Sequence, residues 1–122
     1  MNKYEAEALS FARNFAAEAE TILDVAGVAA ELDAIERGEL RFGDVASRDF
    51  TIVDGATVAA MLINLFMWIG QIRRGQIMRD ASRNEIIQDL IVRVLDNDTL
   101  SGTAKERLLT KALDRMSVQD ER

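Results

Sequence analysis

One stretch of the chain is apolar on almost every side, and it lies between Asp54 and Arg73. No charged side chain occurs from Ala56 to Ile72. A helix with that composition is buried, either in a protein core or in a lipid bilayer. Asp54 is a good N-cap residue, and Arg73 suits the negative end of the helix dipole. The pattern therefore predicts a central helix over about residues 55–73.

Membrane association through residues 50–72 is the alternative for this run. A membrane span needs about 20 apolar residues, and the uncharged run is shorter. Extending it back to Phe50 would place Asp54 inside the bilayer, at a cost of about 3 kcal/mol or more. Trp68 and the arginines after it do fit a membrane boundary. We expect a core helix or an oligomer interface, with a membrane-associated protein as the alternative.

A narrow polar stripe follows one side of the predicted central helix. Thr57, Asn64 and Gln71 are spaced seven apart, and small Ala60 lies close to that side. A buried amide without partners costs about 1–3 kcal/mol, so Asn64 needs a hydrogen bond. Either it bonds across to a partner helix and fixes an oligomeric state, or it bonds a backbone group nearby. These four residues form the candidate self-association surface.

The N-terminal segment, residues 1–37, carries an amphipathic helical stripe. Glu18 interrupts this stripe, which argues against a long coiled coil. Gly27 can divide the segment into two helices, and Gly38 is suited to end it. The apolar positions of the stripe are Tyr4, Ala8, Phe11, Phe15, Ile22, Val25, Ala29 and Leu32.

Residues 38–54 have the weakest helical pattern in the chain. Two glycines and the lack of a 3.6-residue period indicate an ordered connection. The β-type residues near its end allow one short strand or a hairpin, which is marginal unless it packs on helices. We expect its apolar side chains, Phe42, Val45, Phe50 and Ile52, to point into the core.

Two further helices are predicted after the central one, over residues 83–96 and 103–117. Capping boxes at 82–85 and 103–106 open them. Residues 1–122 therefore form a single all-α domain, a small helical bundle around the central helix. The apolar face of the first C-terminal helix is Ile86, Ile87, Leu90, Ile91, Val94 and Leu95, and the last helix buries Leu108, Leu109, Ala112, Leu113 and Met116.

Composition excludes several kinds of chemistry. The chain has no Cys and no His, so it has no disulfide, no Cys/His zinc site and no His general base. The segment 96–107 resembles a calcium loop only in part, because Arg107 stands where a bidentate Glu is needed. No glycine-rich phosphate loop is present. We expect no enzyme activity, no cofactor and no metal. The lack of cysteine and of an apolar leader at the N-terminus suits the cytoplasm.

Charge divides the chain unevenly around its net value of −6. Residues 1–54 hold five cations and twelve carboxylates, whereas residues 55–122 hold ten and nine. In the last helix Arg107, Lys111 and Arg115 form a basic ridge, whose like charges repel one another unless something compensates. The ridge is the basis of an alternative function, a DNA-binding regulator that uses residues 83–117. We expect instead a solvated or protein-paired face, because acidic residues adjoin it and its turn is too long.

A protein interaction function remains after these exclusions. We expect a small, non-catalytic, cytoplasmic module that acts as an adaptor, an inhibitor or a helical subunit of a larger complex. A domain of 122 residues has limited surface with which to cover a central helix on all sides. Self-association through that helix is therefore expected as well.

Overall fold

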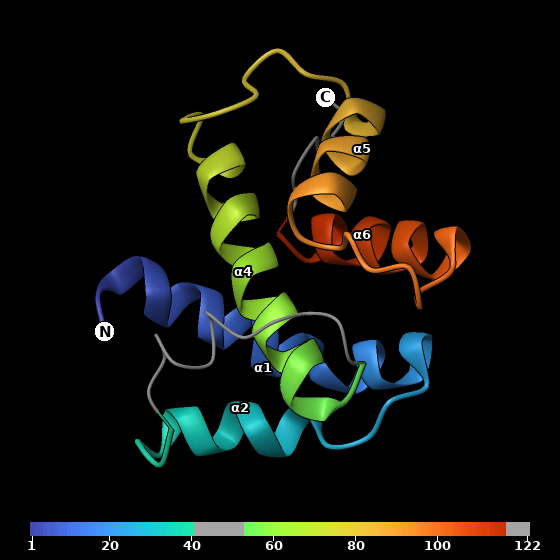
Figure 1. Cartoon of the computed structure of the whole chain (residues 1–122). Coiled ribbons are helices and arrows are strands. Elements are labelled where there is room, and N and C mark those ends of the chain that lie inside the picture. Colours follow the sequence, from blue (N-terminus) through green and yellow to red (C-terminus); the bar gives the residue numbers. More distant parts are fainter. Residues whose placement is uncertain (41–52, 117–122) are drawn as a thin grey trace.

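The described part of the chain is built of helices packed around one central helix (Figure 1). A computed structural model describes residues 1–40 and 53–116, and those residues contain no strand. The all-α bundle with a central helix is thus confirmed. The strand or hairpin predicted in 38–54 falls mainly on residues outside the described ones, as do Phe42, Val45, Phe50 and Ile52. The helices are α1 (Lys3–Leu23), α2 (Val28–Glu36), α4 (Gly55–Arg73), α5 (Arg83–Arg93) and α6 (Gly102–Arg115).

Helix α4 begins and ends where the sequence predicts. The Asp54 carboxylate accepts a hydrogen bond from the Thr57 amide at 2.8 Å, which satisfies one free donor of the first turn. At the other end Gly75 adopts a left-handed φ of 73°. The Gln76 amide then donates to the Gln71 carbonyl at 2.9 Å, which closes a Schellman motif.

Most of the apolar surface of α4 is covered by the chain's own helices. α4 packs against both α1 and α2 (Figure 1). Of the described residues, only Gly55–Arg73 form a helix long and apolar enough to cross a membrane, with a mean hydropathy of 1.5. The core helix of a soluble protein passes the same test, and 67% of that window is buried here. The apolar character of α4 is therefore accounted for by packing within the chain.

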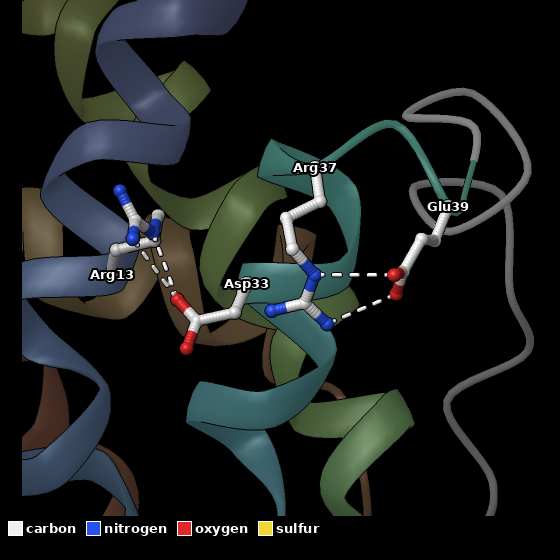
Figure 2. Close-up of polar contacts among 4 residues, drawn as sticks. All are labelled: Arg13, Asp33, Arg37 and Glu39. Carbon is white, nitrogen blue, oxygen red and sulfur yellow. Dashed lines mark hydrogen bonds and ion pairs between the residues drawn. The ribbon is translucent and has the colours of Figure 1, made fainter.

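The N-terminal segment is divided, as Gly27 suggested, but the division begins at Asp24. Asp24 takes the left-handed conformation at φ 53°, and Gly27 takes it at φ 90°. Helix α2 then folds back beside α1. The two helices are linked by an ion pair of 3.1 Å between Arg13 and Asp33 (Figure 2). Helix α2 ends at a second Schellman motif, in which Gly38 has a φ of 78°.

The start of α4 is pressed against the connection between α1 and α2. A Cβ atom added to Gly55 would lie 2.6 Å from the Ala26 carbonyl oxygen and 2.8 Å from the Gly27 carbonyl carbon. Both are backbone atoms, which cannot swing aside as a side chain can. Glycine at position 55 therefore allows α4 to approach this connection closely.

The two C-terminal helices are confirmed, with corrected limits. The Ser82–Glu85 capping box is present, with the Glu85 amide donating to the Ser82 hydroxyl at 3.2 Å. Helix α5 ends at Arg93 rather than at 96. The capping box predicted at Thr103 was wrong, because the N-cap of α6 is Ser101, whose hydroxyl accepts from the Ala104 amide at 3.1 Å.

Candidate interaction surface

The polar stripe of α4 does not form an exposed surface. Thr57 and Ala60 are buried within the chain, 5% and 0% exposed. The Asn64 side chain donates to the Ala60 carbonyl of its own helix at 2.9 Å. Gln71 is only partly exposed, and its carbonyl belongs to the cap of the helix. Thr57 and Ala60 are therefore covered by the chain's own helices, whereas Asn64 and Gln71 are partly exposed. Self-association through Thr57, Ala60, Asn64 and Gln71 stays a prediction.

The basic ridge of α6 faces helix α1. Arg115 forms an ion pair with Glu18 of α1 at 3.1 Å, and its guanidinium lies 5.9 Å from the centre of the Phe15 ring. The two elements pack directly on each other. Glu18, the residue that interrupts the apolar stripe of α1, thus supplies the compensation that the repelling ridge of α6 requires.

A cleft of about 390 Å³ opens between α1 and α6 beside this ion pair. The other two cations of the ridge, Arg107 and Lys111, line it, and both are exposed. Neither forms an ion pair with any residue in the described ranges. We call it the α1–α6 cleft, and its lining residues are Ala17, Glu18, Thr21, Ile22, Arg107 and Lys111.

The wall of the α1–α6 cleft on the α1 side combines apolar and acceptor groups. Ala17 and Ile22 supply apolar surface, and the Thr21 hydroxyl is bonded to the Ala17 carbonyl at 3.1 Å. Glu18 uses one carboxylate oxygen for Arg115. Its other oxygen, Oε2, is shielded from solvent and has no hydrogen-bond partner. The cleft therefore has cations on its α6 side and, on its α1 side, a carboxylate with one oxygen paired to Arg115 and one without a partner.

A second hollow, of about 650 Å³, adjoins the cleft along α1. It shares Ala17 and Thr21 with the cleft but is lined by the carboxylates Glu20 and Asp24 instead of cations. Glu20 accepts a hydrogen bond from the Ala29 amide at 2.9 Å, and neither carboxylate forms an ion pair with a described residue. We call it the acidic hollow, and its lining residues are Ala17, Glu20, Thr21, Asp24, Val25 and Ala26.

Other charged groups of the described residues do not gather into a metal-binding cluster. Residues 1–40 and 53–116 hold no group of three His, Cys, Asp or Glu side chains that could bind a metal ion. In the segment that partly resembles a calcium loop, the Asn97 side chain instead accepts from the Thr99 amide at 2.8 Å. Arg37 lowers the pKa of Glu39 by hydrogen bond and charge, and this exposed pair lies outside both hollows (Figure 2).

The sequence pattern indicated the α6 side of the α1–α6 cleft but not the α1 side. Arg107 and Lys111 were singled out as part of the ridge, together with Arg115. The residues of α1 that face them, Ala17 and Thr21, carry no distinctive pattern of their own. The available signal was Glu18, an acidic residue at an apolar position of an amphipathic helix. Such a residue needs a cation from another element, but the sequence does not say which element supplies it.

Comparisons of the chain with protein-family models, with curated proteins and with solved structures found no match. The function is therefore inferred from the surface itself. This surface is a charged, partly apolar cleft between two helices, bordered by a second hollow of opposite charge.

Proposed function

We propose that this protein is a small, non-catalytic interaction module of the cytoplasm that binds an acidic segment of a protein partner in the α1–α6 cleft. One observation carries the proposal: Arg107 and Lys111 stand free of ion pairs at the edge of a cleft that also offers apolar surface. An adaptor, an inhibitor and a helical subunit would all use such a surface.

The chemistry of the cleft favours a partner that is both acidic and apolar. Charges at the rim of an interface raise the association rate and select the partner, whereas apolar contacts supply more of the affinity. Arg107 adds a planar guanidinium that can hold a carboxylate through two hydrogen bonds. Ala17 and Ile22 offer apolar contact between the charges. A segment with two carboxylates beside one aliphatic side chain matches this arrangement.

The two other functions are less well supported. A membrane role for residues 50–72 would require α4 to leave the helices that cover it, at the cost of its core packing. DNA binding through 83–117 would use the ridge of α6, but Arg115 is already paired with Glu18. The Glu18 carboxylate would also repel phosphate groups that enter the cleft.

The test is a titration of the labelled full-length chain, followed by NMR, with a synthetic helical peptide. The peptide carries two glutamates one turn apart beside a leucine. We expect saturable shifts of the amides of residues 17–22 and 107–111. The double variant Arg107→Glu with Lys111→Glu should weaken binding roughly tenfold or more, because it reverses the sign of the rim.

The matched control is Arg79→Glu, which changes an exposed cation outside the cleft. It should leave the affinity for the peptide unchanged within about twofold. Equal weakening by Arg79→Glu would mean that only net charge matters. A peptide that shifts no amide of α1 or α6 would refute the proposed function.

A further inference from the structure

We propose that the partner of this face is a second copy of this chain, whose acidic hollow receives the cations of the α1–α6 cleft. The inference rests on the proposed function and names the source of its acidic segment. It arises from a juxtaposition: a surface whose cations form no ion pair and a surface whose carboxylates form no ion pair, within the described residues, lie side by side and share Ala17 and Thr21.

Helical geometry places the α1–α6 cleft and the acidic hollow on opposite sides of one line along α1. With 3.6 residues per turn, Ala17, Thr21 and their exposed side chains lie along one line of α1. Glu18 and Ile22 are rotated from this line toward α6, where the cleft lies. Glu20 and Asp24 are rotated the other way. The face is therefore basic on one side of the line and acidic on the other.

Such a face is complementary to itself under one kind of symmetry. Identical chains associate mainly through two-fold axes, which bring the same patch of both copies together. An axis that lies in the contact plane along the line of Ala17 and Thr21 exchanges the two sides of the face. Lys111 and Arg107 of each copy then lie over the carboxylates of the other. An in-plane axis perpendicular to the line would bring like charges together, and repulsion disfavours it.

The short side chains on the line permit this contact. Helices pack with their axes about 8–10 Å apart, and the distance depends on the side chains between them. Ala17 and Thr21 are small enough to allow such an approach, and both are exposed. An acidic peptide from another protein would satisfy the cations but would leave Glu20 and Asp24 unmatched. A second copy satisfies both sides.

The net charge of the chain opposes association, but salt screens this repulsion beyond short distances. Two copies of charge −6 repel each other at low ionic strength. At about 0.15 M salt the Debye length is about 8 Å, so charges outside the contact are largely screened. The pairs inside the contact then decide the outcome. Dimerisation is therefore expected to be weak in very dilute buffer and stronger near physiological salt.

Analytical ultracentrifugation of the full-length chain tests the inference. At 0.15 M salt the parent should show a reversible monomer–dimer equilibrium. Ala17→Arg puts a long cation at the centre of the contact and should weaken dimerisation about tenfold or more. Ala30→Arg is the matched control, because Ala30 is also an exposed helical alanine but lies outside both hollows. It should leave the equilibrium unchanged.

An exchange of charges tests whether the pairs form between copies. Lys111→Glu and Asp24→Lys should each be monomeric. In the dimer of either variant, residue 111 of each copy would face a like charge at residue 24 of the other copy. Mixed in equal amounts they should associate, because both pairs are then attractive again. Asp24 has a left-handed φ of 53°, which disfavours lysine. If that variant melts early, Ala26→Lys puts the same charge in the same hollow without this strain.

The outcomes separate this inference from the proposed function. A parent that stays monomeric at millimolar concentration overturns the inference. If such a monomer still binds the glutamate peptide, the proposed function stands and the partner is an acidic segment of another protein. A dimer that Ala17→Arg and the charge variants leave intact uses another surface, which also overturns the inference. If the chain neither dimerises nor binds the peptide, both proposals fail.

Discussion

At the scale of single residues, Phe66 and Trp68 show how differently two neighbouring aromatic side chains of α4 contribute. Phe66 is 1% exposed and contacts two aromatic rings of α1, one stacked and one edge-on, each with its centre 5.7 Å away. Trp68 is only partly buried, and the Arg93 guanidinium stacks on it with 4.7 Å to the ring centre. The sequence pattern does not distinguish the two, because both belong to the same uncharged run.

Replacing Phe66 and Trp68 by alanine should therefore lower the folding stability by unequal amounts. Phe66→Ala leaves a cavity in a closed core and should cost about 3–5 kcal/mol of folding stability. Trp68→Ala should cost roughly 1–2 kcal/mol, because solvent already reaches the site. Urea unfolding followed by far-UV circular dichroism measures both. Equal losses would show that Trp68 is as firmly packed as Phe66.

The pair Arg37 and Glu39 sets a pH dependence of known sign. The hydrogen bond and the charge of Arg37 lower the pKa of Glu39, and Arg37 has its own pKa raised by the same contact. A lowered carboxyl pKa stabilises the fold above the unfolded-state value of about 4.3. That contribution is lost as the pH falls through the lower, folded-state value.

An NMR titration of the Glu39 carboxyl group checks this. We expect a midpoint below that of an ordinary glutamate in the parent and a return to the ordinary range in Arg37→Gln. Both side chains are more than half exposed, at 58% and 59%, so 1 M salt should also raise the midpoint. A midpoint that does not respond to Arg37→Gln would mean that the ion pair does not persist in solution.

At the scale of elements, the ends of the helices are better determined by the sequence than the contacts between them. Asp54, Ser82, Gly38 and Gly75 act within four or five residues, so their roles are visible in the chain itself. The cap of α6 was missed because two hydroxyl residues lie two positions apart, and only the course of the backbone selects Ser101 over Thr103.

Two glycines of α4 should respond in opposite ways to replacement by alanine. At Gly55 the added Cβ meets backbone atoms of the α1–α2 connection at 2.6 and 2.8 Å. Gly55→Ala should therefore cost about 1–3 kcal/mol, because helices or backbone must shift. At Gly70 the nearest atom, at 3.0 Å, is the end of the flexible Arg74 side chain.

Gly70→Ala is the matched control, since it changes the same residue type in the same helix. The gain in helix propensity, about 1 kcal/mol at most, should offset the displacement of Arg74 and leave stability equal or higher. Thermal unfolding of both variants beside the parent measures the difference. If Gly55→Ala were tolerated as well as Gly70→Ala, the close approach of α4 to the α1–α2 connection would not hold in solution.

At the scale of the whole molecule, the fold followed from the sequence and the surface followed only in part. Hydrophobic periodicity and caps predicted the helical bundle with α4 at its centre. The burial of Thr57 and Ala60 in the polar stripe of α4 could not be predicted, because periodicity cannot say which helices cover which side. The α1–α6 cleft depends on Glu18 meeting Arg115, which are far apart in the chain. No local pattern specifies that meeting.

The contact of Arg93 with Trp68 also gives the molecule an internal optical reporter. Trp68 is the sole tryptophan in the sequence, so all indole emission comes from the place where Arg93 of α5 contacts α4. Local opening that moves α5 away would expose the ring to water while the aromatic core around Phe66 stays closed. A red shift of the emission ahead of the loss of helix would then distinguish partial opening from global unfolding.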